Sequence, residues 1–169
     1  MSLSLRSKQE ILSANVLREQ LELVKNIRDT NYLALRNWIS LKSFPSLCTG
    51  SCELTPGYYT IENNYDPASP IRLISLGTSI DPKAVTISEA NNPRNSTSLR
   101  LCIDDLGRYT HQCTTNMKRS LYYSYLKVEP VKTGAITVPS ALMLTAYFAT
   151  TEGGYREFSM YTILTDWKK

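Results

Sequence analysis

The 169-residue sequence contains no run of about 18 apolar residues, which excludes an ordinary membrane-spanning helix. It has one histidine, and three phenylalanines against eleven tyrosines. No Gly-x-Ser-x-Gly, Gly-rich phosphate loop or His-Glu-x-x-His motif occurs, so the signatures of common hydrolases, nucleotide-binding enzymes and zinc peptidases are missing. We therefore expect a protein without catalytic activity and without a cofactor.

The sequence also lacks the features of exported proteins and of proteins that package nucleic acid. The first ten residues do not show the basic and then apolar order of a signal peptide, so we expect an intracellular protein that is not exported. Nineteen Lys and Arg residues against fifteen Asp and Glu residues give a net charge of +4, without an Arg-rich segment. Nucleic acid is an alternative partner, but so mild a charge does not favour it.

Residues 7–42 contain neither proline nor glycine and are rich in Leu, Glu, Lys, Arg and Gln, which predicts a long helix. Ser7 and Glu10 form a capping-box pattern at its start. Apolar residues gather on one side of the helix and charged residues on the other, so the helix must bury a face. We expect an amphipathic helix in residues 1–43, acting as an oligomerisation or docking arm, and an antiparallel β domain in residues 44–169.

One stripe of this helix has the 4-3-4-3 spacing of a coiled-coil seam, with two polar interruptions that can set register or oligomer number. The seam residues, which we expect to form an oligomer interface, are Leu17, Leu21, Val24, Arg28, Asn31, Leu35 and Trp38. A straight helix over residues 7–42 would extend about 54 Å, longer than a β domain of this size is wide. The alternative is a helix bent near residues 29–31 and folded back over the sheet.

After Phe44 and Pro45 the apolar period changes from about 3.6 to 2, and turn residues recur at short intervals. Short strands without intervening helices are typical of an antiparallel β-sandwich or barrel, jelly-roll forms included. The expected fold class is mainly β, with about eight strands after a long N-terminal α-helix. The predicted strands are 57–62, 71–76, 84–88, 98–103, 108–113, 120–128, 134–138, 141–149 and 155–164.

The four cysteines and the single histidine are the first candidates for chemistry. If residues 104–107 close a tight hairpin, Cys102 and Cys113 lie about 13 Å apart along the strands, beyond the reach of a disulfide. The expected intracellular location also disfavours disulfides. We therefore expect reduced cysteines that act as small packing residues, with one or more disulfides as an alternative.

A zinc site is a second alternative for these residues. Cys48 and Cys52 have a Cys-x3-Cys spacing that zinc sites tolerate, and further cysteine and histidine ligands could complete a tetrahedral set. The other ligands lack the usual paired spacing, so zinc is not favoured. The ligands in this hypothesis of a zinc-dependent enzyme are Cys48, Cys52, Cys102, His111 and Cys113.

Tyrosines alternate along several predicted strands, with basic residues near them in the sequence. Tyrosine packs its ring while its hydroxyl stays hydrated or bonded, so such strands suit contact surfaces. The functional interpretations are a subunit interface or a platform that stacks single-stranded nucleic acid or a small ligand, and the structural interpretation is the rim of an ordinary core. The expected binding face comprises Arg100, Tyr109, His111, Tyr122, Tyr123 and Tyr125.

The outline of a long helix followed by a β domain rich in Tyr, Ser, Thr and Asn is similar to that of virion and phage-tail assembly proteins. The leading hypothesis is a non-enzymatic structural or interaction protein, such as a capsid component of a virion. It would self-assemble as a homo-oligomer through the helix and the tyrosine-rich β domain, or dock a protein partner through the helix. The alternatives are a β module that binds a small ligand or single-stranded nucleic acid, and the zinc-dependent enzyme.

Overall fold

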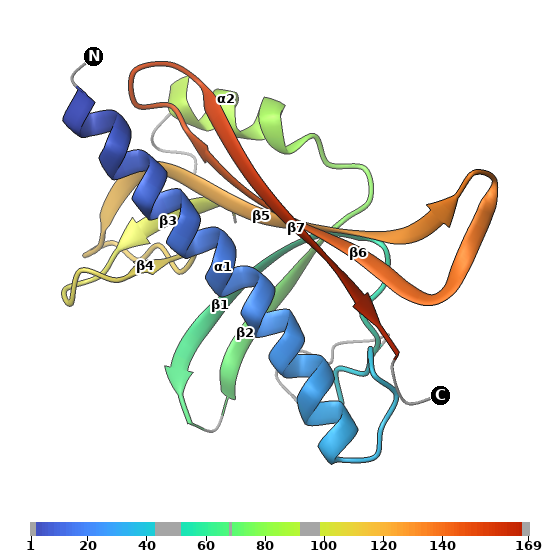
Figure 1. The fold of residues 1–169 in the computed structure, drawn as a ribbon. Helices are drawn as coiled ribbons and strands as arrows, with labels where there is room; N and C mark the ends of the chain where they lie inside the picture. Colours follow the sequence, from blue (N-terminus) through green and yellow to red (C-terminus); the bar gives the residue numbers. More distant parts are fainter. Residues whose placement is uncertain (1–2, 43–51, 68, 92–98, 167–169) are drawn as a thin grey trace.

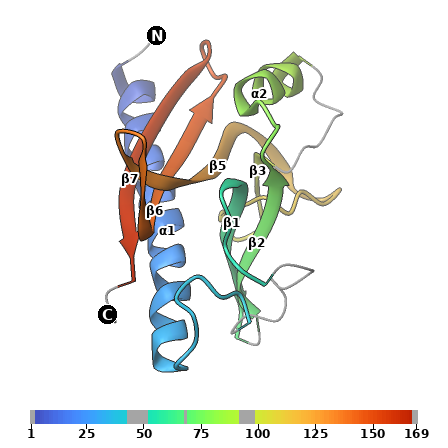
Figure 2. The same cartoon turned by 90° about the vertical axis from the view of Figure 1, so that its right-hand side faces the viewer.

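The computed structural model describes residues 3–42, 52–67, 69–91 and 99–166. These residues form one seven-stranded antiparallel sheet with a long N-terminal helix and a second, short helix (Figures 1 and 2). The elements in chain order are α1 (Leu3–Leu33), β1 (Gly57–Asp66), β2 (Ser69–Gly77), α2 (Pro82–Asn91), β3 (Arg100–Ile103), β4 (Tyr109–Thr110), β5 (Lys118–Thr133), β6 (Ile136–Thr150) and β7 (Arg156–Thr165). The expected class, mainly β with a long N-terminal helix, is confirmed. The described strands form a single open sheet, not a closed barrel.

β5 and β6 are the longest strands and organise the sheet. β6 pairs along one edge of β5 and carries β7 on its far side. The other edge of β5 is shared between two partners, since Tyr123 pairs with Arg100 of β3 whereas Leu126 pairs with Tyr59 of β1. The sheet therefore divides into two branches, β3–β4 and β1–β2, between residues 123 and 126.

α1 lies across one face of the sheet and buries its apolar stripe there (Figure 1). Leu17, Leu21 and Val24 are at most 4% exposed, and they belong to one core cluster with Leu144 and Phe148 of β6. Burial of each such side chain contributes about 1.5–3 kcal/mol. The predicted coiled-coil seam is therefore used within the chain, as in the folded-back alternative.

α1 ends at Leu33, earlier than predicted and without a bend at residues 29–31. Leu35 has a left-handed φ of 53°, its amide donates to the Tyr32 carbonyl, and the Arg36 amide donates to the Asn31 carbonyl. These bonds form a Schellman motif, which usually has glycine at the left-handed position. Because a leucine occupies that position, the sequence carried no glycine signal for the end of the helix.

The last members of the predicted seam have different environments. The Asn31 side chain is fully buried and donates to the carbonyl groups of Trp38 at 3.2 Å and Ser40 at 2.6 Å. Trp38 lies beyond the helix and is 8% exposed, whereas Leu35 is 87% exposed. Asn31 and Trp38 thus stabilise the chain reversal after α1, and the seven seam positions do not form one continuous surface stripe.

α2 replaces the strand predicted at residues 84–88. Asp81 caps this helix, because its Oδ1 accepts hydrogen bonds from the amides of Lys83 and Ala84, both at 3.1 Å. Pro82 follows at the first helical position, where its missing N–H has no cost. Asp-Pro can mark the start of a helix as well as a turn, and the prediction interpreted it only as a turn.

Neither helix of the described residues is both long and apolar enough to cross a membrane.

Two other strand predictions are also changed. The segments 134–138 and 141–149 belong to a single strand, β6, which passes through Ser140 with a positive φ of 58°. The segment 108–113 contains just the two-residue strand β4, after which the chain turns away. This early turn decides the geometry of the cysteines and the histidine.

Candidate functional site

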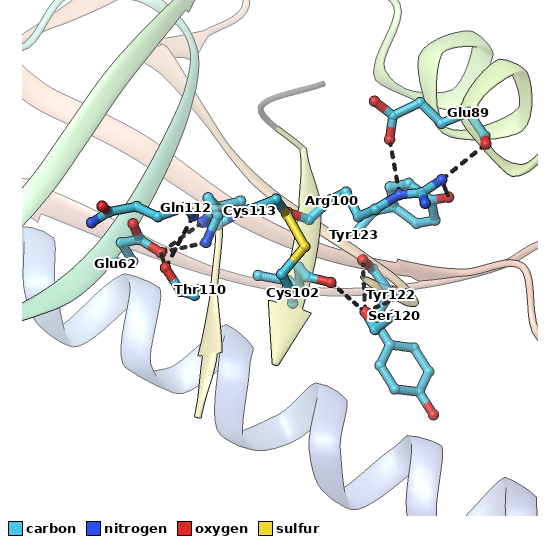
Figure 3. The surroundings of a disulfide bond; sticks show 12 residues. Glu62, Glu89, Arg100, Cys102, Thr110, Gln112, Cys113, Ser120, Tyr122 and Tyr123 are labelled. Carbon is cyan, nitrogen blue, oxygen red and sulfur yellow. Dashed lines mark hydrogen bonds and ion pairs between the residues drawn. A yellow bond between two sulfur atoms is a disulfide. The ribbon is translucent and has the colours of Figure 1, made fainter. Parts of the chain in front are cut away.

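A disulfide joins Cys102 of β3 to Cys113, with an S–S distance of 2.03 Å and Cα atoms 5.4 Å apart (Figure 3). Cys102 pairs with Thr110 across the hairpin, and β4 ends there. The Cys113 amide then donates to the His111 carbonyl at 3.1 Å, a tight turn that returns Cys113 toward Cys102. The predicted separation of these cysteines was wrong because it assumed that the second strand continued straight.

The remaining cysteines also bear on the zinc hypothesis. Cys52 is disulfide-bonded, and Cys48 lies outside the described residues. No free cysteine occurs in the described part of the chain, so the expectation of reduced cysteines was wrong there. Bonded to each other, Cys102 and Cys113 have no thiolate to offer zinc. Nor do the described residues contain a cluster of three or more His, Cys, Asp and Glu side chains that could hold a metal ion.

The turn stabilised by the disulfide places His111 where β5 changes partners. The Nε2 atom of His111 lies 3.1 Å from the carbonyl oxygen of Ser124 and 3.0 Å from its Oγ. The Ser124 amide donates to the Leu99 carbonyl at 2.9 Å, on the β3 side of the junction. The imidazole therefore occupies the place of a backbone donor between the two branches, where an unpaired carbonyl would be costly.

Glu62 of β1 lies on the other side of the His111 ring. Its Oε2 is 3.4 Å from His111 Nδ1, and it accepts hydrogen bonds from the His111 amide and from Thr110 Oγ1. Burial raises the pKa of Glu62, but the hydrogen bonds and charge of His111 outweigh burial and hold the pKa below its ordinary value. His111 Nε2 thus contacts Ser124 of β5, and His111 Nδ1 faces the carboxylate of Glu62 on β1. Glu62 and His111 thus form a buried, charge-assisted link between the branches.

A cavity of about 20 Å³ lies beside this link, between α1 and the sheet. Gln20 of α1 lines it, is 2% exposed, and has no hydrogen-bond partner for either atom of its amide group. Glu19 also lines it, and burial, followed by the charge of Glu62, raises the pKa of Glu19. A polar cavity of this volume can hold about one water molecule.

Glu62, His111 and Ser124 stand in the order of an acid, a base and a nucleophile, as in a hydrolase triad. Two observations argue against that chemistry. Ser124 is fully buried in the middle of β5, and the adjacent cavity of about 20 Å³ cannot admit an acyl group. Ligand pockets usually measure about 300–1,000 Å³. We therefore interpret this cluster as a structural junction.

A second buried polar cluster anchors α2 to the sheet (Figure 3). Arg100 donates to the Glu89 carbonyl and to the Tyr123 hydroxyl, both at 2.9 Å, and its Nε lies 3.5 Å from the Glu89 carboxylate. All three residues are at most 2% exposed. A charge buried this deeply is tolerated when paired and hydrogen-bonded, as here.

The six residues predicted as a binding face do not share an exposed surface. Tyr122 lies in the core under α1 and Tyr123 and Tyr125 in the core on the other face, because successive strand residues point to opposite faces. All three are at most 7% exposed. Arg100 and the His111 side chain are also buried, and the partly buried Tyr109 packs against the Tyr122 ring at 6.0 Å. The described structure offers no continuous stacking platform at these positions.

Apolar side chains do reach the surface on the sheet face that α1 leaves uncovered. We call this surface the open face. Its residues are Tyr58, Lys127, Met143, Tyr147, Tyr161 and Ile163, as the strand pairings place them. Tyr161 is 72% and Ile163 51% exposed. The sequence predicted a strand over residues 155–164, but the sequence alone did not show which of its faces is uncovered.

The aromatic residues of this face are held in place by neighbours on adjacent strands of the same face. Tyr147 stacks on Tyr125 with ring centroids 4.6 Å apart, and Tyr58 meets Tyr125 edge-on at 6.1 Å. The hydroxyls of Tyr125 and Tyr155 both donate to Glu157, at 2.9 and 2.6 Å. Burial and the Glu157 carboxylate raise the pKa of both tyrosines, so both hydroxyls keep their protons at neutral pH.

No protein-family model, curated protein or solved structure matches this sequence. The two buried polar clusters hold elements of the fold together. The most exposed side chains of the open face do not hold elements of the fold together in this way. It is therefore the surface on which a functional proposal can rest.

Proposed function

We propose that this protein is a non-enzymatic structural or interaction protein that self-assembles through the open face. The observation that carries this proposal is the exposure of Tyr161 and Ile163, two residues apart on β7 and on the same face of the sheet. Large apolar side chains gathered on a regular element suit a protein contact, since their burial is the main driving force of association.

The rigidity of this surface supports the proposal. The Tyr125–Tyr147 stack and the hydrogen bonds to Glu157 hold the rings of Tyr125, Tyr147 and Tyr155 in place without a partner. A surface that is already ordered loses less conformational entropy on binding, so more of the contact energy appears as affinity.

The charges around the face also fit an interface. Lys127 and Glu129 form an ion pair at 2.8 Å, and the Lys127 ammonium lies 5.8 Å from the Tyr58 ring centroid. A hollow at the end of the β5–β6 hairpin is lined by Glu129, Lys132, Met143 and Ile163, among others. Apolar residues with polar groups at their margin resemble the core and rim of a protein interface.

The proposal assigns the helix a different role from the predicted one. α1 supports the sheet from behind, and the sheet supplies the contact. A component of a larger assembly, such as a virion or phage tail, is one setting for such a protein. We also propose an oxidising environment, because disulfides such as Cys102–Cys113 persist there and are rare in the cytosol.

Light scattering coupled to size-exclusion chromatography tests the proposal over a range of concentrations. The wild-type chain should exceed the monomer mass of 19.1 kDa increasingly as concentration rises. A Tyr161→Ser, Ile163→Thr double variant should remain a monomer. The matched control is Leu106→Ser, in the turn between β3 and β4, where Leu106 is 75% exposed. A wild-type monomer at every concentration, or a double variant that associates like the wild type, would overturn self-assembly through this face.

A further inference from the structure

β7 is an edge strand whose charged residues, Arg156 and Glu157, are confined to its first two positions. It has ten residues with no proline, glycine or lysine, and its pairing with β6 shows no register shift. β2, at another edge, contains Pro70 and two register irregularities against β1. Proline, lysine and bulges are the devices by which edge strands avoid pairing with other chains. β7 also borders the molecule in Figure 2, with α1 behind it.

The hydrogen bonds at the end of β7 show which of its residues face outward. The Asp166 amide donates to the Ser140 carbonyl of β6 at 3.0 Å, so even-numbered residues direct their backbone groups toward β6. Odd-numbered residues then direct theirs outward. Thr165, an odd-numbered residue, follows this rule, because its carbonyl accepts the Tyr32 hydroxyl of α1 at 3.2 Å and not a bond from β6. The outward backbone groups are those of residues 157, 159, 161, 163 and 165.

We propose that a second copy of this chain pairs antiparallel with β7, with Tyr161 opposite Tyr161 on a twofold axis. This inference rests on the proposed function and specifies the partner and the register. A symmetric antiparallel pair needs outward groups on both opposed residues, so their numbers must have the same parity. The Tyr161 register meets this condition along the strand, and at its end the Thr165 carbonyl would have to share a bond from the second copy with the Tyr32 hydroxyl that it already accepts.

Charge complementarity selects this register among those that parity allows. The numbers of two opposed residues add to 322 in this register, so Arg156 of each copy faces Asp166 of the other at both ends of the pair. This contact would add to the hydrogen bond that Asp166 Oδ1 accepts from the Tyr32 hydroxyl at 3.1 Å. A shift that centres the pair on Met160 would place Arg156 opposite Leu164. A shift that centres it on Thr162 would place Asp166 opposite Phe158. Opposed charges across strands stabilise a pair, whereas a charge facing an apolar residue gains nothing comparable.

The paired strands would also extend the open face. In this register Ile163 of one copy faces Ser159 of the other, beside the two tyrosines, and the sheets of both copies become continuous. About ten residues per copy is fewer than the 20–30 of a standard interface, so we expect a dimer that depends on concentration.

Cysteine cross-linking of the full chain tests the register. Opposed residues of a hydrogen-bonded antiparallel pair have Cα atoms about 5.5 Å apart, within disulfide range. Tyr161→Cys should therefore give a covalent dimer under mild oxidation. Ile163→Cys alone should not, because the two copies of residue 163 lie about 13 Å apart. A mixture of Ile163→Cys and Ser159→Cys chains should cross-link to each other. Leu106→Cys is the control for random collision.

A charge exchange tests the same register without new thiols. Arg156→Glu should weaken self-association about tenfold, because both ends of the dimer would then oppose like charges. Mixing Arg156→Glu chains with Asp166→Lys chains should restore association, since each end of the mixed dimer again carries opposite charges. Thermal unfolding of each variant shows whether its fold is intact before mixing.

The outcomes separate this inference from the proposed function. If the chain associates and the open-face double variant does not, but Tyr161→Cys fails to cross-link or Ile163→Cys alone cross-links equally well, the register is wrong and assembly through the open face stands. The register would also be wrong if mixing Arg156→Glu chains with Asp166→Lys chains did not restore association. If the wild type is a monomer throughout, both proposals fail.

Discussion

His111 Nε2 lies 3.1 Å from the carbonyl oxygen of Ser124, at the position where β5 exchanges β3 for β1 as its neighbour. A side chain thus bonds to a carbonyl at the junction where the two branches of the sheet separate. The Cys102–Cys113 disulfide holds the turn that carries the imidazole, and Glu62 holds the ring from the opposite side. The stability of the two-branched sheet should depend on each of these groups.

Glu62→Gln should destabilise the protein by about 2 kcal/mol at pH 7, because the substitution removes a buried carboxylate that accepts several hydrogen bonds. The folded-state pKa of Glu62 is lower than its ordinary value of 4.5. Its contribution is therefore fully present above that value and is lost as pH falls through the folded pKa. Urea unfolding of both proteins at pH 7 and at about pH 3 should show the difference shrinking at the lower pH. An equal difference at both pH values would contradict an ionised Glu62.

Glu19→Gln is the matched control, with the opposite sign. Partial burial beside the cavity and the charge of Glu62 outweigh a hydrogen bond from the Asn63 backbone and raise the pKa of Glu19, so ionised Glu19 opposes folding above its folded pKa. Glutamine should therefore stabilise the protein at pH 7, by less than about 1 kcal/mol, because much of the Glu19 side chain remains open to solvent, which screens its charge. The gain should vanish as pH falls toward about 4.5, which the same urea series measures. A loss of stability at pH 7 would show that the Glu19 charge is favourable instead.

Removing the disulfide by Cys102→Ser and Cys113→Ser together should cost about 3 kcal/mol, the value expected for a closed loop of this length. The loss should be largest around β4, because the turn that positions His111 would no longer be closed. Thermal unfolding measures the stability, and hydrogen exchange of the amides near His111 measures the local effect. Unchanged protection there would mean that hydrogen bonds alone hold the turn.

Leu21→Ala and Leu35→Gly separate the internal role of α1 from an interface role. Leu21 is 4% exposed in the core, so its truncation should cost about 2–5 kcal/mol. Leu35 is 87% exposed with a left-handed φ, so glycine should be neutral or stabilise the chain by up to about 1 kcal/mol. Urea unfolding of the monomeric open-face double variant carrying each change gives these values free of association. Equal costs at the two positions would contradict the packing described here.

Local sequence patterns were sufficient for the main elements. The segment without proline or glycine predicted α1, and the period of two predicted β1, β2, β5 and β7, because these signals reflect which side of each element must be buried. α2 was missed although Asp81 and Pro82 carry a helix start signal, because the segment is short and shows little periodicity. The end of α1 was missed because Leu35 takes a conformation that the sequence does not announce.

The sequence by itself determined that the chain buries one face of a long helix and folds into an antiparallel β protein, since both follow from the order of apolar and polar residues along each segment. Tertiary structure decided what that helix covers, whether Cys102 meets Cys113, and which tyrosines stay exposed. Each of these outcomes depends on a strand that ends or changes partner, as β4 does after Thr110 and β5 does near Ser124. Such events are set by pairings between distant segments, which no local pattern records.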